Sequence, residues 1–364
     1  MSEEINKQQI SDALAETKKD QTMPDGYVAI ELSTKGKFGA PAKFHMRNFR
    51  TEDLIGLSLA EDDKVQLKVV SMLQDLIYEK DVKIGDFHEK EVIEAIVRLY
   101  RKFNQTKLRE IPWTLTEEDK KAIAIEMGGE DNPQYKARIN AIERGEEKAF
   151  FDIDLNQLKF YDVDKTKVTG TARVTKIIDG KEFTVEYSYP KYGDAVLLRN
   201  FMYNVPEFKE GEKRFRAIRE NVKFRQRMEQ EWEDGKSVDL TRLPRFSEQD
   251  MDAFREYEER KARFATKCVK ALHLKTIDGK DISSLSLEQK IEYADDPRLD
   301  HQTFAQVNKA YDEMKIGIDE NIKALDPYTH KVVDIVYPFR LFSLLQALRD
   351  NKPDGIVINF VQGN

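Results

Sequence analysis

Apolar residues recur at helical spacing in several segments of the first third of the chain. Residues 65–77 and 92–103 each carry one apolar face, and Thr116 begins a further helix that Gly128 and Gly129 end. Apolar residues repeating at i, i+3, i+4 and i+7 are typical of a helix packed against a core. A threonine cap and a glycine stop mark the ends of such a helix. The pattern therefore predicts a small helical bundle.

Other parts of the chain alternate apolar and polar residues with the period of two that is typical of strands. Residues 27–32 and 44–47 predict a β-hairpin that precedes the helices. The alternation returns from residue 150 onward, where the runs 168–178 and 183–189 flank an Asp-Gly pair at 179–180. An Asp-Gly pair between two alternating runs is a strong hairpin signal. A central β module is therefore predicted.

Charged residues dominate the segment that follows the β module. Residues 207–274 predict a charged helical hairpin, with Ser247 as the cap of its second helix. Nearer the C-terminus the pattern predicts a hairpin, a short apolar helix and a terminal strand, at residues 322–336, 339–348 and 356–360.

Together these elements predict an α+β protein. The β module includes the apolar run 195–205, and we expect residues 321–337 to complete it. The predicted parts are a flexible N-terminal arm (1–24), a hairpin plus helical domain (25–149), the β module (150–206), the charged helical hairpin (207–275) and a mixed C-terminal module (276–364).

The composition indicates a folded chain in a reducing compartment. Of the 364 residues, 40% are hydrophobic and 35% are charged, which is enough for two or three domains with cores. The net charge of -7 disfavours a general nucleic-acid coat. Cys268 is the single cysteine, so it has no internal disulfide partner. Residues 1–20 lack the apolar region of a signal peptide, and no run resembles a membrane span, so we expect neither secretion nor membrane insertion.

The pattern of reactive residues does not indicate a catalytic or metal-binding set. No two histidines lie three or four residues apart, so no helix presents a metal-binding pair. Cys268 lies on an apolar stripe, which favours a buried thiol over a nucleophile. Acidic pairs near the strands are compatible with a divalent ion or with solvent-facing strand positions, namely Asp152, Asp154, Asp162 and Asp164. We therefore expect no enzyme activity, no catalytic residue, no metal site and no cofactor.

A basic segment is the first candidate for a partner interface. Residues 209–227 contain eight Lys or Arg and three Glu, interleaved with phenylalanines. Arg214, Phe215 and Arg216 are the candidates within it. Three readings stay open: a solvated helix, a surface for an acidic protein, and a site that binds single-stranded nucleic acid through phosphates and stacking.

An aromatic cluster near the C-terminus is the second candidate. Its residues are Tyr337, Phe339, Arg340 and Phe342. Aromatic residues and arginine dominate the hot spots of protein interfaces. The alternative is that these residues form the core of the C-terminal module.

The first part of the chain resembles a phage protein family. Residues 47–54 read Arg-Asn-Phe-Arg-Thr-Glu-Asp-Leu between the hairpin and a helix, and residues 84–87 read Ile-Gly-Asp-Phe at the start of a second helix. This order is similar to that of base-plate hub and tail-assembly proteins of contractile-tailed, T4-like bacteriophages, over residues 27–103. Members of that family often carry cysteine doublets late in the chain, which this sequence lacks, so no zinc role is carried over.

The resemblance implies other tail or base-plate proteins as partners, of hub, wedge or tape-measure type. It also implies assembly in the host cytoplasm and a location in the tail base plate of the virion. The first hypothesis is thus a structural or assembly protein that acts by protein–protein binding. The alternatives are a tail-assembly chaperone absent from the mature virion and a nucleic-acid-binding accessory protein. Homo-oligomer formation stays open, and no membrane partner is expected.

Overall fold

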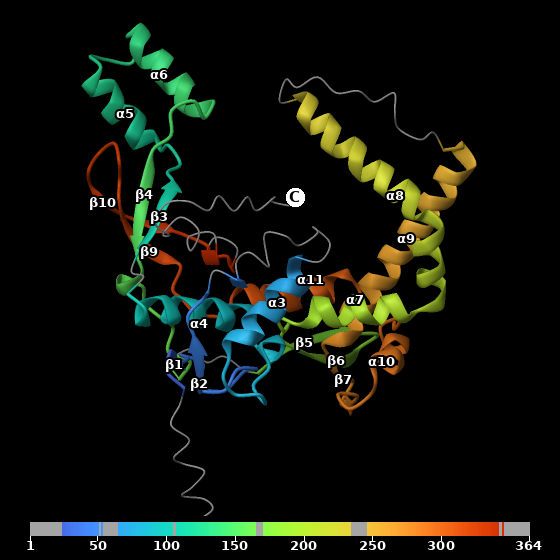
Figure 1. Cartoon of the computed structure of the whole chain (residues 1–364). Helices are drawn as coiled ribbons and strands as arrows, with labels where there is room; N and C mark the ends of the chain where they lie inside the picture. The colour runs from blue at the N-terminus through green and yellow to red at the C-terminus, as the bar shows by residue number, and fades with distance from the viewer. Residues whose placement is uncertain are drawn as a thin grey trace, which may run out of the picture. The chain divides into compact units, whose positions relative to one another are not determined.

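The computed structural model describes residues 24–50, 52–53, 65–104, 107–164, 170–233, 246–341 and 344–345. The chain is α+β, as predicted, with helices and small antiparallel sheets (Figure 1). It divides into two compact units, of which unit 1 comprises residues 1–84, 90–162 and 316–364, and unit 2 comprises residues 85–89 and 163–315. The predicted terminal strand, Phe342 and all of the predicted N-terminal arm except Pro24 lie outside the described residues.

Unit 1 begins with the predicted hairpin and two helices. Strand β1 (Tyr27–Glu31) pairs with β2 (Lys43–Arg47), and helices α3 (Val65–Leu76) and α4 (Glu89–Lys102) follow. The short 3-10 helix η2 (Ile84–Asp86) between the two helices begins in unit 1, but its last two residues belong to unit 2. Two buried carboxylates of α4 accept hydrogen bonds from the loop between β1 and β2: Glu91 from Thr34 at 2.6 Å, and Glu94 from the backbone N–H of Ser33 at 2.8 Å. Because a buried charge is tolerated only when it is hydrogen-bonded, these bonds fix the loop against α4.

A pair of helices is inserted between two strands of unit 1. Strand β3 (Lys107–Pro112) pairs with β4 (Phe150–Asp154), and α5 (Glu117–Glu126) and α6 (Pro133–Glu143) lie between them in the chain (Figure 1). The predicted cap is confirmed, because the Thr116 side chain accepts from the N–H of Asp119 in a capping box. The predicted glycine stop is also confirmed, since Gly128 follows the helix with φ +83°.

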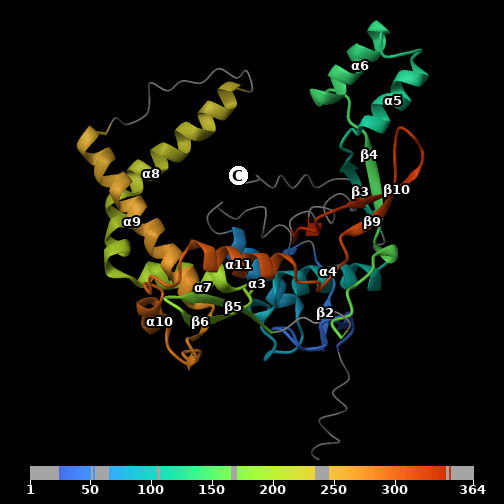
Figure 2. The same ribbon diagram turned by 180° about the vertical axis from the view of Figure 1, so that it is seen from behind.

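The C-terminal hairpin of unit 1 lies beside β4. Strand β9 (Asn321–Leu325) pairs with β10 (Val332–Val336), as predicted, and β9 contacts β4 (Figure 2). The short 3-10 helix η3 (Leu155–Gln157) follows β4. A row of aromatic rings connects the β3–β4 pair with the β9–β10 hairpin, with centroid separations of 5.5 Å for Trp113 and Phe151, 6.5 Å for Phe151 and Tyr337, and 5.0 Å for Tyr337 and Phe339.

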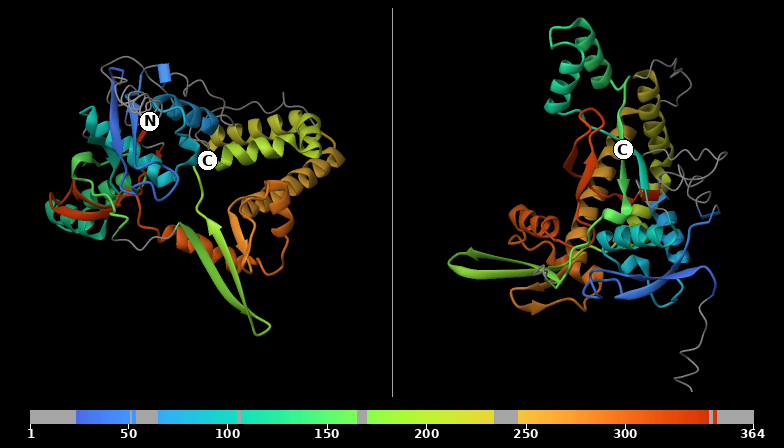
Figure 3. Two further views of the ribbon diagram at one scale, coloured as in Figure 1. Left: turned by 90° about the horizontal axis from the view of Figure 1, so that it is seen from below. Right: turned by 90° about the vertical axis from the view of Figure 1, so that its left-hand side faces the viewer.

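Unit 2 contains a four-stranded antiparallel sheet in the order β5-β6-β7-β8. The strands are β5 (Thr171–Ile178), β6 (Lys181–Ser188), β7 (Leu274–Ile277) and β8 (Lys280–Asp281). The predicted Asp-Gly hairpin joins β5 and β6, which extend beyond the shorter strands β7 and β8 (Figure 3). Helices α10 (Leu287–Tyr293) and α11 (His301–Asp312) follow these strands, and Leu299 and Val307 pack into the apolar core of the sheet.

The strand pairing corrects the predicted β module. Residues 321–337 do not complete the sheet of β5 and β6, because residues 274–281 do so instead, and β4 pairs with β3 in unit 1. The apolar run 195–205, assigned to that module, forms helix α7 (Asp194–Asn204). The predicted module of residues 276–364 is likewise divided, since unit 2 ends at Lys315. A hairpin is specified by its own turn, whereas the choice of a third strand depends on contacts distant in sequence.

Two long helices occupy the segment for which a helical hairpin was predicted. They are α8 (Pro206–Glu233) and α9 (Glu248–Leu272), and Ser247 caps α9 by accepting from the N–H of Asp250, as predicted. In Figures 1 and 2 the first part of α8 lies beside α9, whereas the far end of α8 lies away from it. None of the described helices combines the length and the apolar character that a bilayer span requires.

Candidate interaction surface on the helical hairpin

Aromatic residues form the contact between α8 and α9. Phe208, Phe215 and Ile218 of α8 are buried together with Phe254 and Tyr257 of α9. The rings of Phe215 and Tyr257 lie 5.2 Å apart between centroids. Large apolar side chains at helical spacing on both helices bury a continuous stripe, which sets how the two helices pack.

Gly211 permits the closest approach of the two helices. A Cβ atom at this position would lie 2.0 Å from Cε2 of Tyr257, far inside van der Waals contact. Glycine within a helix costs backbone entropy relative to alanine. Its presence here is explained by the tyrosine ring that occupies the space of a side chain.

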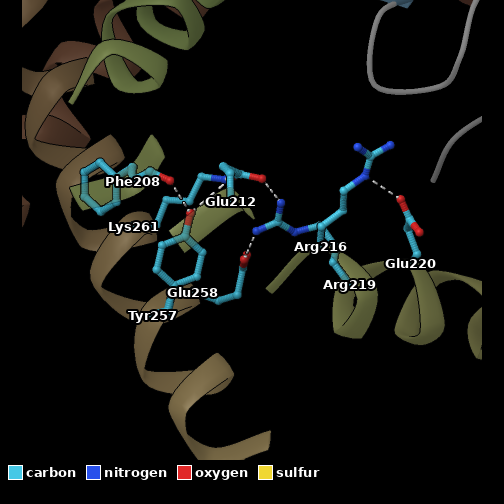
Figure 4. Close-up of polar contacts among 8 residues, drawn as sticks. All are labelled: Phe208, Glu212, Arg216, Arg219, Glu220, Tyr257, Glu258 and Lys261. Carbon is cyan, nitrogen blue, oxygen red and sulfur yellow. Dashed lines mark hydrogen bonds and ion pairs between the residues drawn. The ribbon is translucent and has the colours of Figure 1, made fainter. Parts of the chain in front are cut away.

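A cluster of charged groups lies beside this core (Figure 4). Glu212 of α8 forms ion pairs with Arg219 of the same helix and with Lys261 of α9, and Arg219 also pairs with Glu258 of α9. The Tyr257 hydroxyl donates to the carbonyl oxygen of Phe208 at 3.1 Å and also lies 3.3 Å from Glu212 Oε1. The cluster therefore couples the two helices through charge-assisted hydrogen bonds.

The pKa values of the cluster reflect burial opposed by close charges. Burial tends to raise the pKa of Glu212, but hydrogen bonds from Lys261 and Arg219 outweigh it and hold this pKa below its ordinary value. Burial, reinforced by the charge of Glu212, raises the pKa of Tyr257 to about 12. Glu212 is thus an ionised, structural carboxylate near neutral pH.

The opposite side of α8 carries most of the exposed charge. Between residues 209 and 225 the exposed ionisable residues include only two acids, Glu210 and Glu220. The exposed basic residues of this stretch, which we name the α8 basic face, are Lys209, Lys213, Arg214, Arg216, Lys223 and Arg225. Four of them, Lys209, Lys213, Arg216 and Lys223, share one side of the helix by their spacing. The hairpin therefore neutralises its inner charges and leaves a basic outer surface.

The ion pairs within the α8 basic face are local and exposed. Nε of Arg216 lies 2.9 Å from Oε1 of Glu220 (Figure 4), and Nζ of Lys213 lies 3.2 Å from Oε1 of Glu210. Exposed pairs of this kind contribute little to stability. They are consequently easy to exchange for contacts with a partner.

The three candidates that the sequence placed on α8 have different environments. Arg214 and Arg216 are exposed, and the Arg214 guanidinium lies 4.8 Å from the centroid of the Phe215 ring. The candidacy of Phe215 is corrected, because this side chain is 5% exposed in the core between α8 and α9. The exposed aromatic residue of the segment is Phe224, at 43%, and it lies between Lys223 and Arg225.

The candidates near the C-terminus have different environments in unit 1. Phe339 is 6% exposed, so it is corrected from an interface residue to a core residue. Tyr337 is half-buried between the rings of Phe151 and Phe339, whereas Arg340 is exposed. Phe342 lies outside the described residues. These candidates belong to unit 1, whereas the α8 candidates belong to unit 2.

Sequence reasoning identified the basic segment but missed the inner charge cluster. The basic run already included Lys209, Lys213 and Lys223. Their helical spacing was the signal that could have shown that they share one side of the helix, away from the buried side. By contrast, the pairing of Glu212 and Arg219 with Glu258 and Lys261 depends on the packing of α8 against α9, which no local pattern specifies.

Two histidines of the described residues lie beside carboxylates. The ring of His273 lies 3.1 Å from Asp194, and that of His45 lies 2.5 Å from Glu79. Cys268 is fully buried, and burial raises its pKa to about 11. Within the part of the chain that the structure describes, no group of three or more His, Cys, Asp or Glu side chains has the arrangement of a metal site.

A hollow of about 440 Å³ lies on the open face of the sheet in unit 2. Its lining is polar and of mixed charge, and includes Arg173, Glu186 and Asp278. Arg173 and Glu186 are 3.9 Å apart. Because opposite charges alternate across it, the hollow favours no single ligand class over water.

Comparison of the chain with protein-family models, with curated proteins and with solved structures finds no match.

Proposed function

We propose that the protein is a non-catalytic assembly protein that binds an acidic surface of another protein through the α8 basic face. The observation that carries this proposal is the separation of charge on α8. Its inner carboxylate Glu212 is held by Arg219 and Lys261, while six basic residues of α8 are exposed, four of them on one outer side. Complementary charge across an interface accelerates association and selects the partner.

The contractile-tail base plate is the setting that we propose for this binding. The resemblance of residues 27–103 to base-plate hub and tail-assembly proteins supports it. The partners are then other tail proteins, met in the host cytoplasm during assembly. A structural component stays in the virion, whereas a tail-assembly chaperone leaves before maturation.

Affinity capture of the tagged full-length chain from the producing cell tests this proposal. We expect tail or base-plate proteins to co-purify at low salt and to dissociate as the salt concentration rises. Mass spectrometry of purified particles then separates the two roles, since only a structural component is retained. Absence of any tail protein among the captured chains would contradict the proposal.

The exposed position of Phe224 favours one second candidate, a nucleic-acid-binding accessory protein. An accessible ring flanked by cations provides both stacking and phosphate contacts for a single strand. This candidate predicts salt-dependent retention on single-stranded DNA, lost when Arg214, Arg216 and Arg225 are replaced by Ala. Retention that is unchanged in this variant would count against it.

A further inference from the structure

A buried aspartate in the first turn of α5 has hydrogen-bond donors on one of its two carboxylate oxygens only. Oδ2 of Asp119 accepts from Nε1 of Trp113 at 2.9 Å and from the backbone N–H of Thr116 at 2.7 Å. Oδ1 is buried as well, and no donor among the described residues reaches it. Asp119 is 0% exposed, so Oδ1 has no access to bulk solvent either.

This arrangement of donors matches a neutral carboxylic acid. A protonated carboxyl group has one carbonyl oxygen, which accepts hydrogen bonds, and one hydroxyl, which donates one. Oδ2 of Asp119, with its two N–H donors, takes the carbonyl role and leaves Oδ1 as the hydroxyl. The ionised form would instead bury negative charge on Oδ1 without a donor, which costs free energy. The geometry therefore favours a proton on Oδ1.

An acceptor for this proton lies in the turn between β9 and β10. Asp326 is 3% exposed, and a side-chain hydrogen bond joins it to Asp119. Its own donors come from the turn, because Oδ1 accepts from the N–H groups of Tyr328 and Thr329 at 2.8 and 3.0 Å, and Oδ2 accepts from the Thr329 hydroxyl at 2.6 Å. Since an ionised carboxylate only accepts, a hydrogen bond between two carboxyl groups requires a proton on one of them.

The surroundings of Asp326 favour its ionised form. Burial tends to raise the pKa of Asp326, but hydrogen bonds from Thr329 and from Asp119 outweigh it and hold this pKa below its ordinary value. When two carboxyl groups share a buried site, one of them keeps a proton because two adjacent negative charges repel each other. Asp326 is thus the ionised member of the pair and Asp119 the neutral one.

The other charged groups around the pair do not take the place of this proton. Burial raises the pKa of Tyr328 in the turn, as do Glu147 and both aspartates, whereas Arg138 of α6 lowers it. Arg138 and Glu147 pair with each other at 3.1 Å, and His330 of the same turn is exposed. No third His, Cys, Asp or Glu side chain of the described residues joins the two aspartates into a metal site.

We propose that the hydroxyl of a neutral Asp119 donates to the Asp326 carboxylate, and that this shared proton holds α5 against the β9–β10 turn. The bond connects the inserted helices α5 and α6 with a hairpin that lies far from them in sequence. Loss of the proton leaves two buried anions in contact, so the attachment of α5 to the turn weakens as the pH rises. This inference does not depend on the α8 basic face.

The pH dependence of stability tests the shared proton. An aspartate in an unfolded chain loses its proton at a pKa of about 3.9, so above this pH folding takes up one proton for as long as the folded chain retains it. In Asp119→Asn the amide accepts and donates in the same places as the neutral acid but takes up no proton.

The unfolding equilibrium constant of the full chain is compared with that of Asp119→Asn by chemical denaturation at several pH values. The ratio of the first constant to the second should rise by up to about tenfold per pH unit above about pH 5. A ratio that does not change with pH would overturn the proposal. Asp152→Asn, at an exposed position on β4 of the same unit, is the matched control and should give a constant ratio.

A bound cation is the alternative that the same variants exclude. Added magnesium or calcium chloride should stabilise the full chain no more than it stabilises Asp119→Asn. A larger stabilisation of the full chain would refute the shared proton, since a cation would then lie between the two carboxylates.

Infrared spectroscopy detects the proton in the folded chain without denaturation. At about pH 7 the full chain should show the C=O stretching band of a neutral carboxyl group, because free aspartates are ionised at this pH. The band should be lost in Asp119→Asn and retained in Asp152→Asn. Absence of the band from the full chain would contradict the proposal whether or not the variants fold.

Discussion

Gly211 is a residue at which the packing of two helices excludes every side chain. Its missing Cβ is replaced in space by the ring of Tyr257, which also bonds the carbonyl of Phe208. Any substitution must move the tyrosine or separate α8 from α9. The stability of the α8–α9 hairpin therefore depends on the absence of a side chain at position 211.

We expect Gly211→Ala to lower the free energy of unfolding by about 1–3 kcal/mol, the usual cost of overpacking. Gly170→Ala is the matched control, because no atom lies within 4 Å of the Cβ position at Gly170. Chemical denaturation of the full chain measures both changes. An equal effect of the two substitutions would show that Tyr257 does not occupy the space beside Gly211.

At the scale of the element, Glu212 makes the α8–α9 hairpin sensitive to acid. Its pKa lies below the ordinary value because bonds from Lys261 and Arg219 outweigh burial. A carboxylate of this kind contributes stability above its unfolded pKa of about 4.3, and that contribution is lost as the pH falls through the folded pKa. The hairpin should thus weaken below about pH 4.

Replacing Glu212 by Gln should cost about 1–3 kcal/mol at pH 7 and should reduce the loss of stability between pH 5 and pH 3. The loss is not abolished, because Asp53 and Asp300 also have lowered pKa values. Glu256→Gln, at an exposed position on α9, is the control. Denaturation followed by circular dichroism at several pH values in this range measures the free energy of unfolding of each variant. The same pH dependence of this free energy in both variants would contradict the role of Glu212.

Local elements were predictable from sequence where a cap or a turn marks them. Thr116, Ser247 and the Asp-Gly pair at 179–180 each act through the backbone next to them, so their elements could be located without tertiary information. Helix α7 was missed because a short apolar run has no period that separates a helix from a strand. In the structure α7 has no buried residue, so its sequence has no apolar face with helical spacing that would have indicated a helix.

Long-range choices were not predictable. Phe215 and Phe224 are both aromatic residues in the same basic run, and only the position of α9 decides that the first is buried and the second exposed. Likewise, nothing in the β5–β6 hairpin selects β7 rather than β9 as its neighbour. The sequence could therefore predict which segment carries the candidate surface, but not which of its side chains are exposed on that surface.

At the scale of the whole molecule, unit 2 interrupts unit 1. The chain leaves unit 1 at Asp162 and returns at Ile316. The two points are adjacent within unit 1, because the N–H of Tyr161 donates to the carbonyl of Gly317 at 2.9 Å and the N–H of Asp319 donates to that of Lys159 at 2.8 Å. Ends that lie close together are typical of an inserted domain.

A chain in which a short Gly-Ser linker replaces residues 163–315 should therefore retain a folded unit 1. We expect a cooperative thermal transition, although residues 85–89 lose the partners that they have in unit 2. Calorimetry and amide exchange at Leu99 and Tyr100, which are buried on α4, report on this unit. A chain without cooperative unfolding would show that unit 1 depends on the insertion.

Binding of a partner protein by the α8 basic face is the claim on which the proposed function depends. The most direct measurement compares the affinity of a captured partner for two variants with the same change in net charge. In the first, Lys209, Lys213 and Lys223 become Gln, and in the second, the exposed Lys121, Lys136 and Lys181 become Gln. We predict at least about a tenfold loss of affinity at low salt for the first variant and little change for the second. Equal affinities for both variants would contradict the account.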